Sequence, residues 1–169
     1  EAFKKAIVWS MAWELLGFGC GWGPMNARFD KFFGGYRHFA RPGTIKLPLF
    51  RGAPLIGGDT RNYIDVIAYV LAQLSLFRVL FAPEVTPALL LPCFVLVGLN
   101  GVLDKTLFLA ARYEHYWVVM GAMIFAAANE LWIAGAMLTW SFIWIWAAVS
   151  KWNGHFPSVI MFMMNNGPF

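Results

Sequence analysis

The sequence predicts an all-α membrane protein, a polytopic bundle of four or five transmembrane helices. Residues 116–149 form a run of thirty-four residues with a single charged side chain. Of the whole chain, 60% is hydrophobic and only 13% is charged, whereas soluble domains carry about 25% charged residues. The nine Trp and five Tyr residues suit the aromatic belts at membrane–water interfaces. We expect one membrane domain over residues 1–169.

The first apolar segment covers residues 6–24, with Glu14 as its one charge. A carboxylate midway along a span is costly in lipid, so Glu14 should face protein or water and be paired or protonated. Three roles for Glu14 stay open at this point. Its side chain belongs to a proton or cation path, anchors a lipid headgroup, or fixes helix packing through a hydrogen bond. Two interleaved GxxxG patterns follow, at Gly17, Gly19, Gly21 and Gly23. They indicate either close helix approach in lipid or a glycine-rich helix end.

Residues 25–61 form a long polar stretch in which seven basic residues face two acidic ones. The local charge of +5 exceeds the +4 of the whole chain. By the positive-inside rule this stretch is a cytoplasmic loop, and its Pro and Gly residues predict turns rather than a folded domain. Its basic side chains either contact anionic lipid headgroups or a partner's acidic surface, or they only determine topology. The candidates are Arg37, Arg41, Lys46, Arg51 and Arg61.

Two further spans are expected over residues 62–82 and 88–103, joined by a turn that holds no basic residue. Asp65 lies near the start of the first of these spans, within reach of the interface. The polar stretch 104–115 then returns the chain to the cytoplasmic side, which it shares with the basic loop.

The run at 116–149 is too long for one straight span, because it makes roughly 51 Å of helix against a hydrocarbon core of about 30 Å. We favour two spans, the first starting near Thr106 and the second ending near Lys151. The turn between them is expected at residues 129–132. The alternative is one tilted or broken helix that bends near Gly135.

The expected membrane depth of three residues depends on whether the run makes one span or two. Glu130 is interfacial if the run makes two spans and deep in the membrane if it makes one. With two spans, Trp140 and Trp144 fall at mid-span, although Trp prefers the interface. Large rings at that depth predict contact with a partner chain, a missing part of the same protein, or an ordered lipid or pigment.

The sequence offers few groups for catalysis or metal binding. It holds no HExxH, GxSxG or Walker motif, and three histidines are too few for a di-iron centre. His115 and His155 are weak candidates for ligating a metal or a tetrapyrrole magnesium, so we predict no metal site and no cofactor beyond a bound lipid or pigment. Cys20 and Cys93 lie in apolar segments and are expected to be free, buried thiols.

Several motifs together resemble a family of bacterial multi-pass membrane proteins from mycobacteria and proteobacteria, described as a domain of unknown function. In chain order they are GFGCGWGPMNARF, RPGTIKLPLF, GDTR, DKTLFLAARYEHY and SKWNGHFP. The resemblance covers nearly the whole chain and implies a multi-pass protein of the bacterial inner membrane. Members of that family are longer, so we expect this chain to be a piece of a longer protein. The resemblance implies no activity, cofactor or catalytic residue.

Two functions from different classes follow. The first is an accessory or structural subunit of a larger membrane complex, either energy-transducing (photosynthetic or respiratory) or lipid-handling. Its partners would be other integral membrane subunits and anionic lipids, with no nucleic acid. The alternative is a membrane enzyme or transporter that acts on a lipid or quinone, with Glu14, Arg41, Lys46 and Lys151 as candidate residues. The few catalytic groups favour the subunit.

Overall fold

The computed structural model describes residues 1–18, 34–111, 113–127 and 130–165. Within these ranges the regular structure is helical, which confirms the predicted all-α fold. The helices are α1 (Ala2–Leu15), α2 (Gly34–Phe39), α3 (Tyr63–Phe81), α4 (Pro87–Leu103), α5 (Thr106–Ala111), α6 (Tyr113–Phe125), α7 (Leu131–Ser150) and α8 (Phe156–Asn165).

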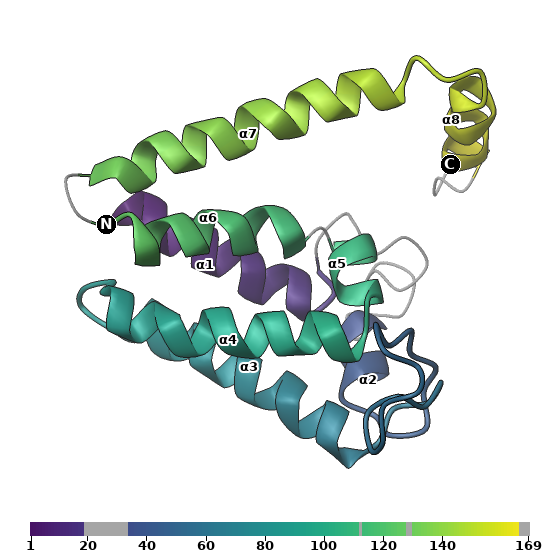
Figure 1. Ribbon diagram of the computed structural model, residues 1–169, viewed down its shortest axis with the longest axis horizontal. Helices are drawn as coiled ribbons and strands as arrows, with labels where there is room; N and C mark the ends of the chain where they lie inside the picture. Colours follow the sequence, from purple (N-terminus) through teal and green to yellow (C-terminus); the bar gives the residue numbers. More distant parts are fainter. Residues whose placement is uncertain (19–33, 112, 128–129, 166–169) are drawn as a thin grey trace.

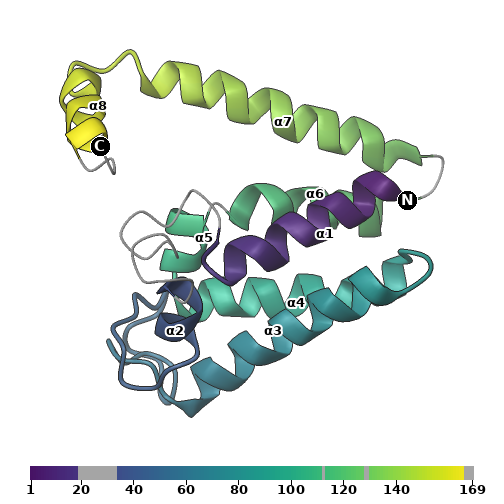
Figure 2. The same cartoon turned by 180° about the vertical axis from the view of Figure 1, so that it is seen from behind.

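Four of these helices close into a ring (Figure 1). Helix α3 packs between α1 and α4, and α6 completes the ring by packing on both α4 and α1. Helix α7 lies outside the ring, against α6, and Figure 2 shows the same arrangement from behind. The ring encloses a core of fully buried apolar side chains, which includes Val8, Met11, Leu76, Val79, Cys93, Val119 and Met120. The free, buried thiol of Cys93 confirms the prediction for that residue, and Cys20 lies outside the described residues.

Polar contacts tie the start of α1 to the turn between α3 and α4. Lys5 Nζ donates to the carbonyl of Ala82 at 2.7 Å, and the Glu1 carboxylate accepts from the Val85 amide at 3.1 Å. The end of α6 and the start of α7 lie at this same end of the ring (Figure 1). Lys5 therefore caps the carboxyl end of α3, where a cation also complements the helix dipole.

The opposite end carries the described part of the predicted basic loop. The Leu49 amide donates to the carbonyl of Val102 at 2.9 Å, and the Lys105 amide donates to the carbonyl of Leu47 at 2.7 Å. The basic loop and the start of the 104–115 stretch thus share one end of the bundle, as predicted. Their cytoplasmic placement stays a prediction.

Local sequence signals account for the limits of α3 and α4. Asn62 and Asp65 form a capping box at the start of α3, in which each side chain accepts from the other residue's backbone amide, so two orphan N–H groups are satisfied. At the start of α4, Thr86 accepts from the Leu89 amide, and Pro87 occupies the first turn, where its missing N–H costs nothing.

The long apolar run forms two separate helices, with a break close to the expected turn, while the crossing of the membrane by both helices stays a prediction. Helix α6 ends at Phe125 and α7 begins at Leu131, after Glu130 adopts a left-handed conformation with φ of 58°. The predicted start near Thr106 was wrong, because residues Thr106–Ala111 form the separate short helix α5. Its Phe108 ring packs so closely on Gly101 of α4 that an added Cβ there would lie 1.4 Å from the ring.

Two helices, α3 and α7, are long and apolar enough to cross a membrane, and α4 is a shorter apolar helix. The nineteen residues of α3 make about 28 Å of helix, close to the hydrocarbon thickness of about 30 Å. The predicted number of four or five spans stays a prediction.

Candidate functional site

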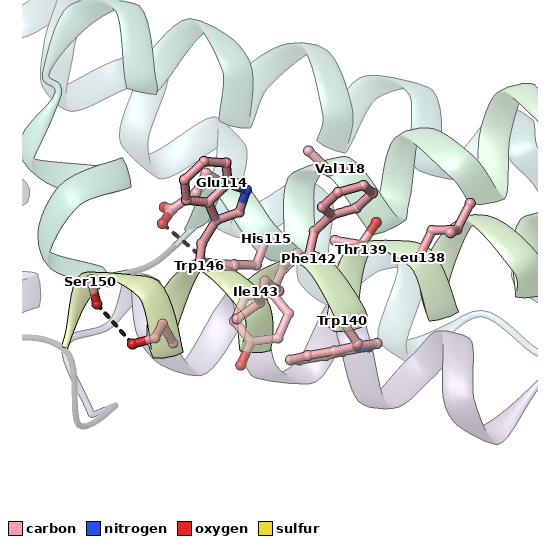
Figure 3. A pocket seen from close by; sticks show the side chains of 12 residues that line it. Glu114, His115, Val118, Leu138, Thr139, Trp140, Phe142, Ile143, Trp146 and Ser150 are labelled. Atoms are coloured by element: carbon pink, nitrogen blue, oxygen red, sulfur yellow. Dashed lines mark hydrogen bonds and ion pairs between the residues drawn. The ribbon is translucent and has the colours of Figure 1, made fainter. Parts of the chain in front are cut away.

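An open groove of about 750 Å³ runs between α6 and α7 (Figure 3). Its lining residues are Glu114, His115, Tyr116, Val118, Leu138, Thr139, Trp140, Phe142, Ile143, Trp146, Ala147 and Ser150. Pockets that hold small molecules typically measure about 300–1,000 Å³ and are mostly apolar, with a few polar groups. The size and lining of the groove fit this description.

The groove exists because residue size changes along the two helices. Near their connection, Gly135 of α7 faces Ala122 of α6 so closely that an added Cβ would lie 2.9 Å from the Ala122 Cβ. Ala136, the buried residue of α7, follows. Farther along, large side chains such as Tyr116 and Trp146 line the groove. The small residues let the backbones approach near the connection, and the large ones form the walls of the open part.

The ionisable groups of the groove, Glu114 and His115, lie at one end. Glu114 and His115 lie toward the Ser150 end of α7 in Figure 3, whereas Leu138 lies at the other end. His115 Nδ1 is 3.2 Å from a carboxylate oxygen of Glu114, so the two side chains form an ion pair when the histidine is protonated. Ser150 Oγ donates to the carbonyl of Ala147 at 2.9 Å and keeps its acceptor capacity. This end combines an acid, an imidazole and a hydroxyl.

The rest of the groove is mainly apolar and reaches toward the middle of α7, where the Thr139 hydroxyl donates to the carbonyl of Gly135 at 2.8 Å. Leu138 and Ser150 lie twelve positions apart on α7, which corresponds to about 18 Å of helix. That length is close to one leaflet of hydrocarbon, or about 15 Å. Phe142, at the centre of this wall, is 57% exposed, so the groove is open along its side.

The structure separates the two mid-span tryptophans. Trp140 is half-buried, lines the groove and meets the ring of Tyr116 edge-on, with 6.2 Å between ring centroids. Trp144 is 73% exposed and is not among the residues that line the groove. Trp140 therefore has a packing partner within the chain, while Trp144 is an open surface. Contact of either ring with another molecule stays a prediction.

A second polar cluster lies at the same end of the bundle, beneath the basic loop. Lys46 Nζ lies 2.7 Å from both carboxylate oxygens of Asp65 and also donates to the carbonyl of Ile56 at 2.9 Å. Lys46 and Asp65 are only 1% and 2% exposed. A lysine at this depth is tolerated because the pairing and hydrogen bonds offset its desolvation.

The neighbouring ion pair joins Arg61 to Asp104, and both are buried. Asp104 also accepts from the Leu47 amide at 3.1 Å and from the hydroxyl of Thr106 at 2.7 Å. The Arg61 guanidinium lies 4.3 Å from the centre of the Phe39 ring, a cation–π contact. Burial lowers the pKa of Arg61, and the Asp104 charge opposes this shift.

These two pairs correct part of the sequence analysis. Lys46 and Arg61 are not surface contacts for headgroups, because their charges are engaged inside the protein. Asp65, expected to reach the interface, is the buried partner of Lys46. Arg37, Arg41 and Arg51 are exposed, as a headgroup contact requires. The described part of this loop is therefore held by specific contacts rather than being a series of turns alone.

The predicted intramembrane acids differ in their surroundings. Glu14 of α1 is half-buried, with its Oε2 atom shut off from solvent. Glu130 is exposed beside the start of α7. Gly17 makes a close backbone approach, although its neighbour is Gly35 at the start of α2 rather than a long helix. The other three glycines of the predicted pattern lie outside the described residues.

The histidines do not gather into a metal site. Within the described ranges, no three His, Cys, Asp or Glu side chains lie close enough to hold a metal ion. His155 is exposed in the turn after α7, and Lys151 is exposed at the end of that helix. His38 lies 3.1 Å from the carbonyl of Ile45, and its pKa is lowered by burial and by the charge of Arg61. His38 therefore adds little positive charge to the loop at neutral pH.

Three functional residues were not predicted from the sequence. Glu114 and Ser150 belong to the polar end of the groove, and Asp104 is the partner of Arg61 beneath the basic loop. One signal was available for the groove. If residues 116–149 form two antiparallel helices, the residues just before the first must lie near the end of the second. No comparable signal existed for the Arg61–Asp104 pair, because its members are separated by forty-three positions.

Comparison with protein families gives one match. A family model described as a transmembrane protein of unknown function (DUF3556) matches residues 2–169. No curated protein and no solved structure matches the chain. The matched region includes every helix of the bundle and both polar clusters. The chain therefore belongs to this family of transmembrane proteins of unknown function, and its helical bundle is that of an integral membrane protein.

Proposed function

We propose that this protein holds a single lipid molecule in the groove between α6 and α7, as part of a lipid-handling role in the membrane. The observation that carries the proposal is the polarity of the groove. Its acid, its imidazole and the Ser150 hydroxyl lie at one end, and its remaining wall is mainly apolar. An amphiphile has the same division into a polar head and an apolar tail.

The placement of the groove supports a lipid rather than a water-soluble ligand. Its polar end lies at the end of α7, where a helix of twenty residues would meet the headgroup region. The apolar part extends about 18 Å toward the helix centre, which suits an acyl chain from one leaflet. The exposed Phe142 leaves the side of the groove open, so a lipid enters without first leaving the bilayer.

Filling the groove is expected to displace the lipid. Ala147 lines the groove, whereas its neighbour Ala148 is exposed on the other side of α7. Ala147→Trp should therefore lower the phospholipid retained per chain several-fold after purification in mild detergent, measured by lipid extraction and mass spectrometry. Ala148→Trp adds the same ring outside the groove and should retain the lipid of the parent protein.

Equal lipid retention by the two variants would contradict the proposal, as would a parent protein that keeps no lipid under conditions in which its helix content is intact. Glu114→Gln tests the polar end separately. It should change which headgroups are retained, with a smaller effect on the total amount.

A specific observation also favours the accessory-subunit function. Helix α7 buries one residue, Ala136, among its twenty. Trp144, 73% exposed, lies about 5 Å from the helix midpoint, deeper than the interface that Trp prefers. Together with the exposed Met137 and Ile145, it forms an outer face that another membrane helix would cover.

Crosslinking in native membranes tests this second function. A photoreactive residue in place of Trp144 should give one adduct of constant mass that contains a second membrane protein. The same residue at Leu71, which is exposed on α3, should give lipid adducts without that band. Identical products from the two positions would show that α7 faces lipid as α3 does.

A further inference from the structure

The segment between α2 and α3 is a hairpin-like loop, residues 43–61, whose two arms are paired. The Gly43 amide donates to the carbonyl of Arg61 and the Arg61 amide to that of Thr44, both at 2.8 Å. The Lys46 amide donates to the carbonyl of Asp59 at 2.9 Å. These bonds fix the arms, and the residues between them, 47–58, form the tip of the loop.

The loop is pinned to the bundle from inside. Lys46 on one arm pairs with Asp65 in the first turn of α3, and Arg61 on the other arm pairs with Asp104 at the end of α4. Both pairs are buried. The amide of Leu49 and the carbonyl of Leu47 add backbone bonds to the end of α4 and to the residue after Asp104. The two ion pairs and these backbone bonds therefore fix the position of the tip relative to the helices.

The outer surface of this loop has the opposite character from its interior. Its charged residues Lys46 and Arg61 point inward, while large apolar side chains point outward. The large exposed apolar residues are Ile45 (72%), Leu47 (37%), Leu49 (49%), Phe50 (60%) and Leu55 (79%). Leu55 also has a φ of 70°, which is rare and strained for a leucine. An arrangement that buries cations and exposes apolar groups does not suit a loop surrounded by water.

Two exposed cations lie close to the apolar side chains of the tip in the sequence. Arg41 precedes the first arm, and Arg51 lies within the tip. The loop also carries one exposed acid, Asp59. The loop joins α3 at Tyr63, the first residue of a helix about 28 Å long. If α3 crosses the hydrocarbon core, which is about 30 Å thick, the loop lies at the level of the headgroups. Apolar side chains at this level insert into the acyl boundary, and neighbouring Arg residues attract anionic headgroups.

We propose that the loop of residues 43–61 is an interfacial anchor for anionic lipid. Phe50 and Leu55 insert into the headgroup–acyl boundary of the adjoining leaflet, and Arg41 and Arg51 contact phosphate groups of anionic phospholipids. The two buried ion pairs hold the loop in position for this contact. The anchor is independent of the α6–α7 groove, which lies on other helices.

Depth measurements on spin labels test the anchor. The full chain, with Cys20→Ser and Cys93→Ala, is labelled through Phe50→Cys or Leu55→Cys and placed in nanodiscs that contain phosphatidylglycerol. Glu84→Cys, in the exposed turn after α3, gives the value for water, and Leu71→Cys gives the value for hydrocarbon. At both tip positions, the ratio of collisions with oxygen to collisions with a nickel chelate should be several-fold above the Glu84→Cys value.

The anionic lipid and the two arginines are tested on the same labels. Replacing phosphatidylglycerol by phosphatidylcholine should lower the ratio at both tip positions. The pair Arg41→Gln and Arg51→Gln should lower it equally in phosphatidylglycerol. Tip labels that match Glu84→Cys in every nanodisc would overturn the anchor, and insertion that ignores both lipid charge and the arginines would overturn the recognition of anionic lipid.

Discussion

Asp104→Asn is expected to destabilise the protein by about 3–5 kcal/mol, the cost of removing one partner from a buried ion pair. The Arg61 charge would stay buried without a counter-charge. An amide also cannot replace the carboxylate geometrically. One oxygen of Asp104 accepts from Leu47 and Thr106 while the other faces Arg61. In Asn one of these acceptors becomes an NH₂ donor, which either opposes the guanidinium or loses the other bonds.

Reversible unfolding in mixed micelles, followed by circular dichroism, measures this change in the free energy of unfolding. Asp59→Asn is the matched control, because it removes an exposed carboxylate from the same loop and should change stability by less than about 0.5 kcal/mol. Adding Arg61→Met to Asp104→Asn should recover part of the loss, since the unpaired charge is then gone. If Asp104→Asn and Asp59→Asn are equally stable, the pair does not pin the loop.

The sequence was informative wherever a property repeats locally. The low number of charges over 116–149 predicted the two helices α6 and α7. The polar residues around Glu130 marked the break between them. The limits of α3 and α4 follow from caps and prolines that are visible within four residues of each helix start. Such features depend on near neighbours along the chain, which the sequence displays directly.

The loop interior was hidden because its partners are distant in the chain. Lys46 and Arg61 are basic residues, as are the exposed Arg41 and Arg51, and no local pattern separates the two sets. What separates them is whether a carboxylate from α3 or α4 reaches them after folding. The net charge therefore predicted a basic loop, but it did not predict which of its basic side chains are buried.

The groove illustrates an intermediate case. Glu114 and His115 are adjacent in the sequence, so their pairing was accessible, but Ser150 joins them only through the antiparallel packing of α6 and α7. The opening between those helices depends on the contrast of small residues at Gly135 with large ones such as Trp146. Both residues can be read from the sequence, but the opening that they produce follows only when the packing of α6 against α7 is known.

The contact of Gly17 with Gly35 lies where α1 ends and α2 begins. Gly17 has a φ of +83°, and a Cβ built on it would lie 2.5 Å from both the Cα and the N atom of Gly35. The Tyr36 amide donates to the carbonyl of Leu16 at 3.1 Å across this contact. Because the obstructing atoms belong to backbone, no change of rotamer relieves the overlap.

Gly17→Ala is therefore expected to cost about 1–2 kcal/mol for the left-handed backbone and about 1–3 kcal/mol more for overpacking. Gly35→Ala meets Gly17 Cα at 2.6 Å without a positive φ, so its loss should be smaller because only the steric part remains. Gly52→Ala, with no atom within 4 Å of the added Cβ, should be close to neutral. The same unfolding measurement ranks the three variants. A Gly17→Ala protein as stable as Gly52→Ala would show that α1 and α2 do not approach at these glycines.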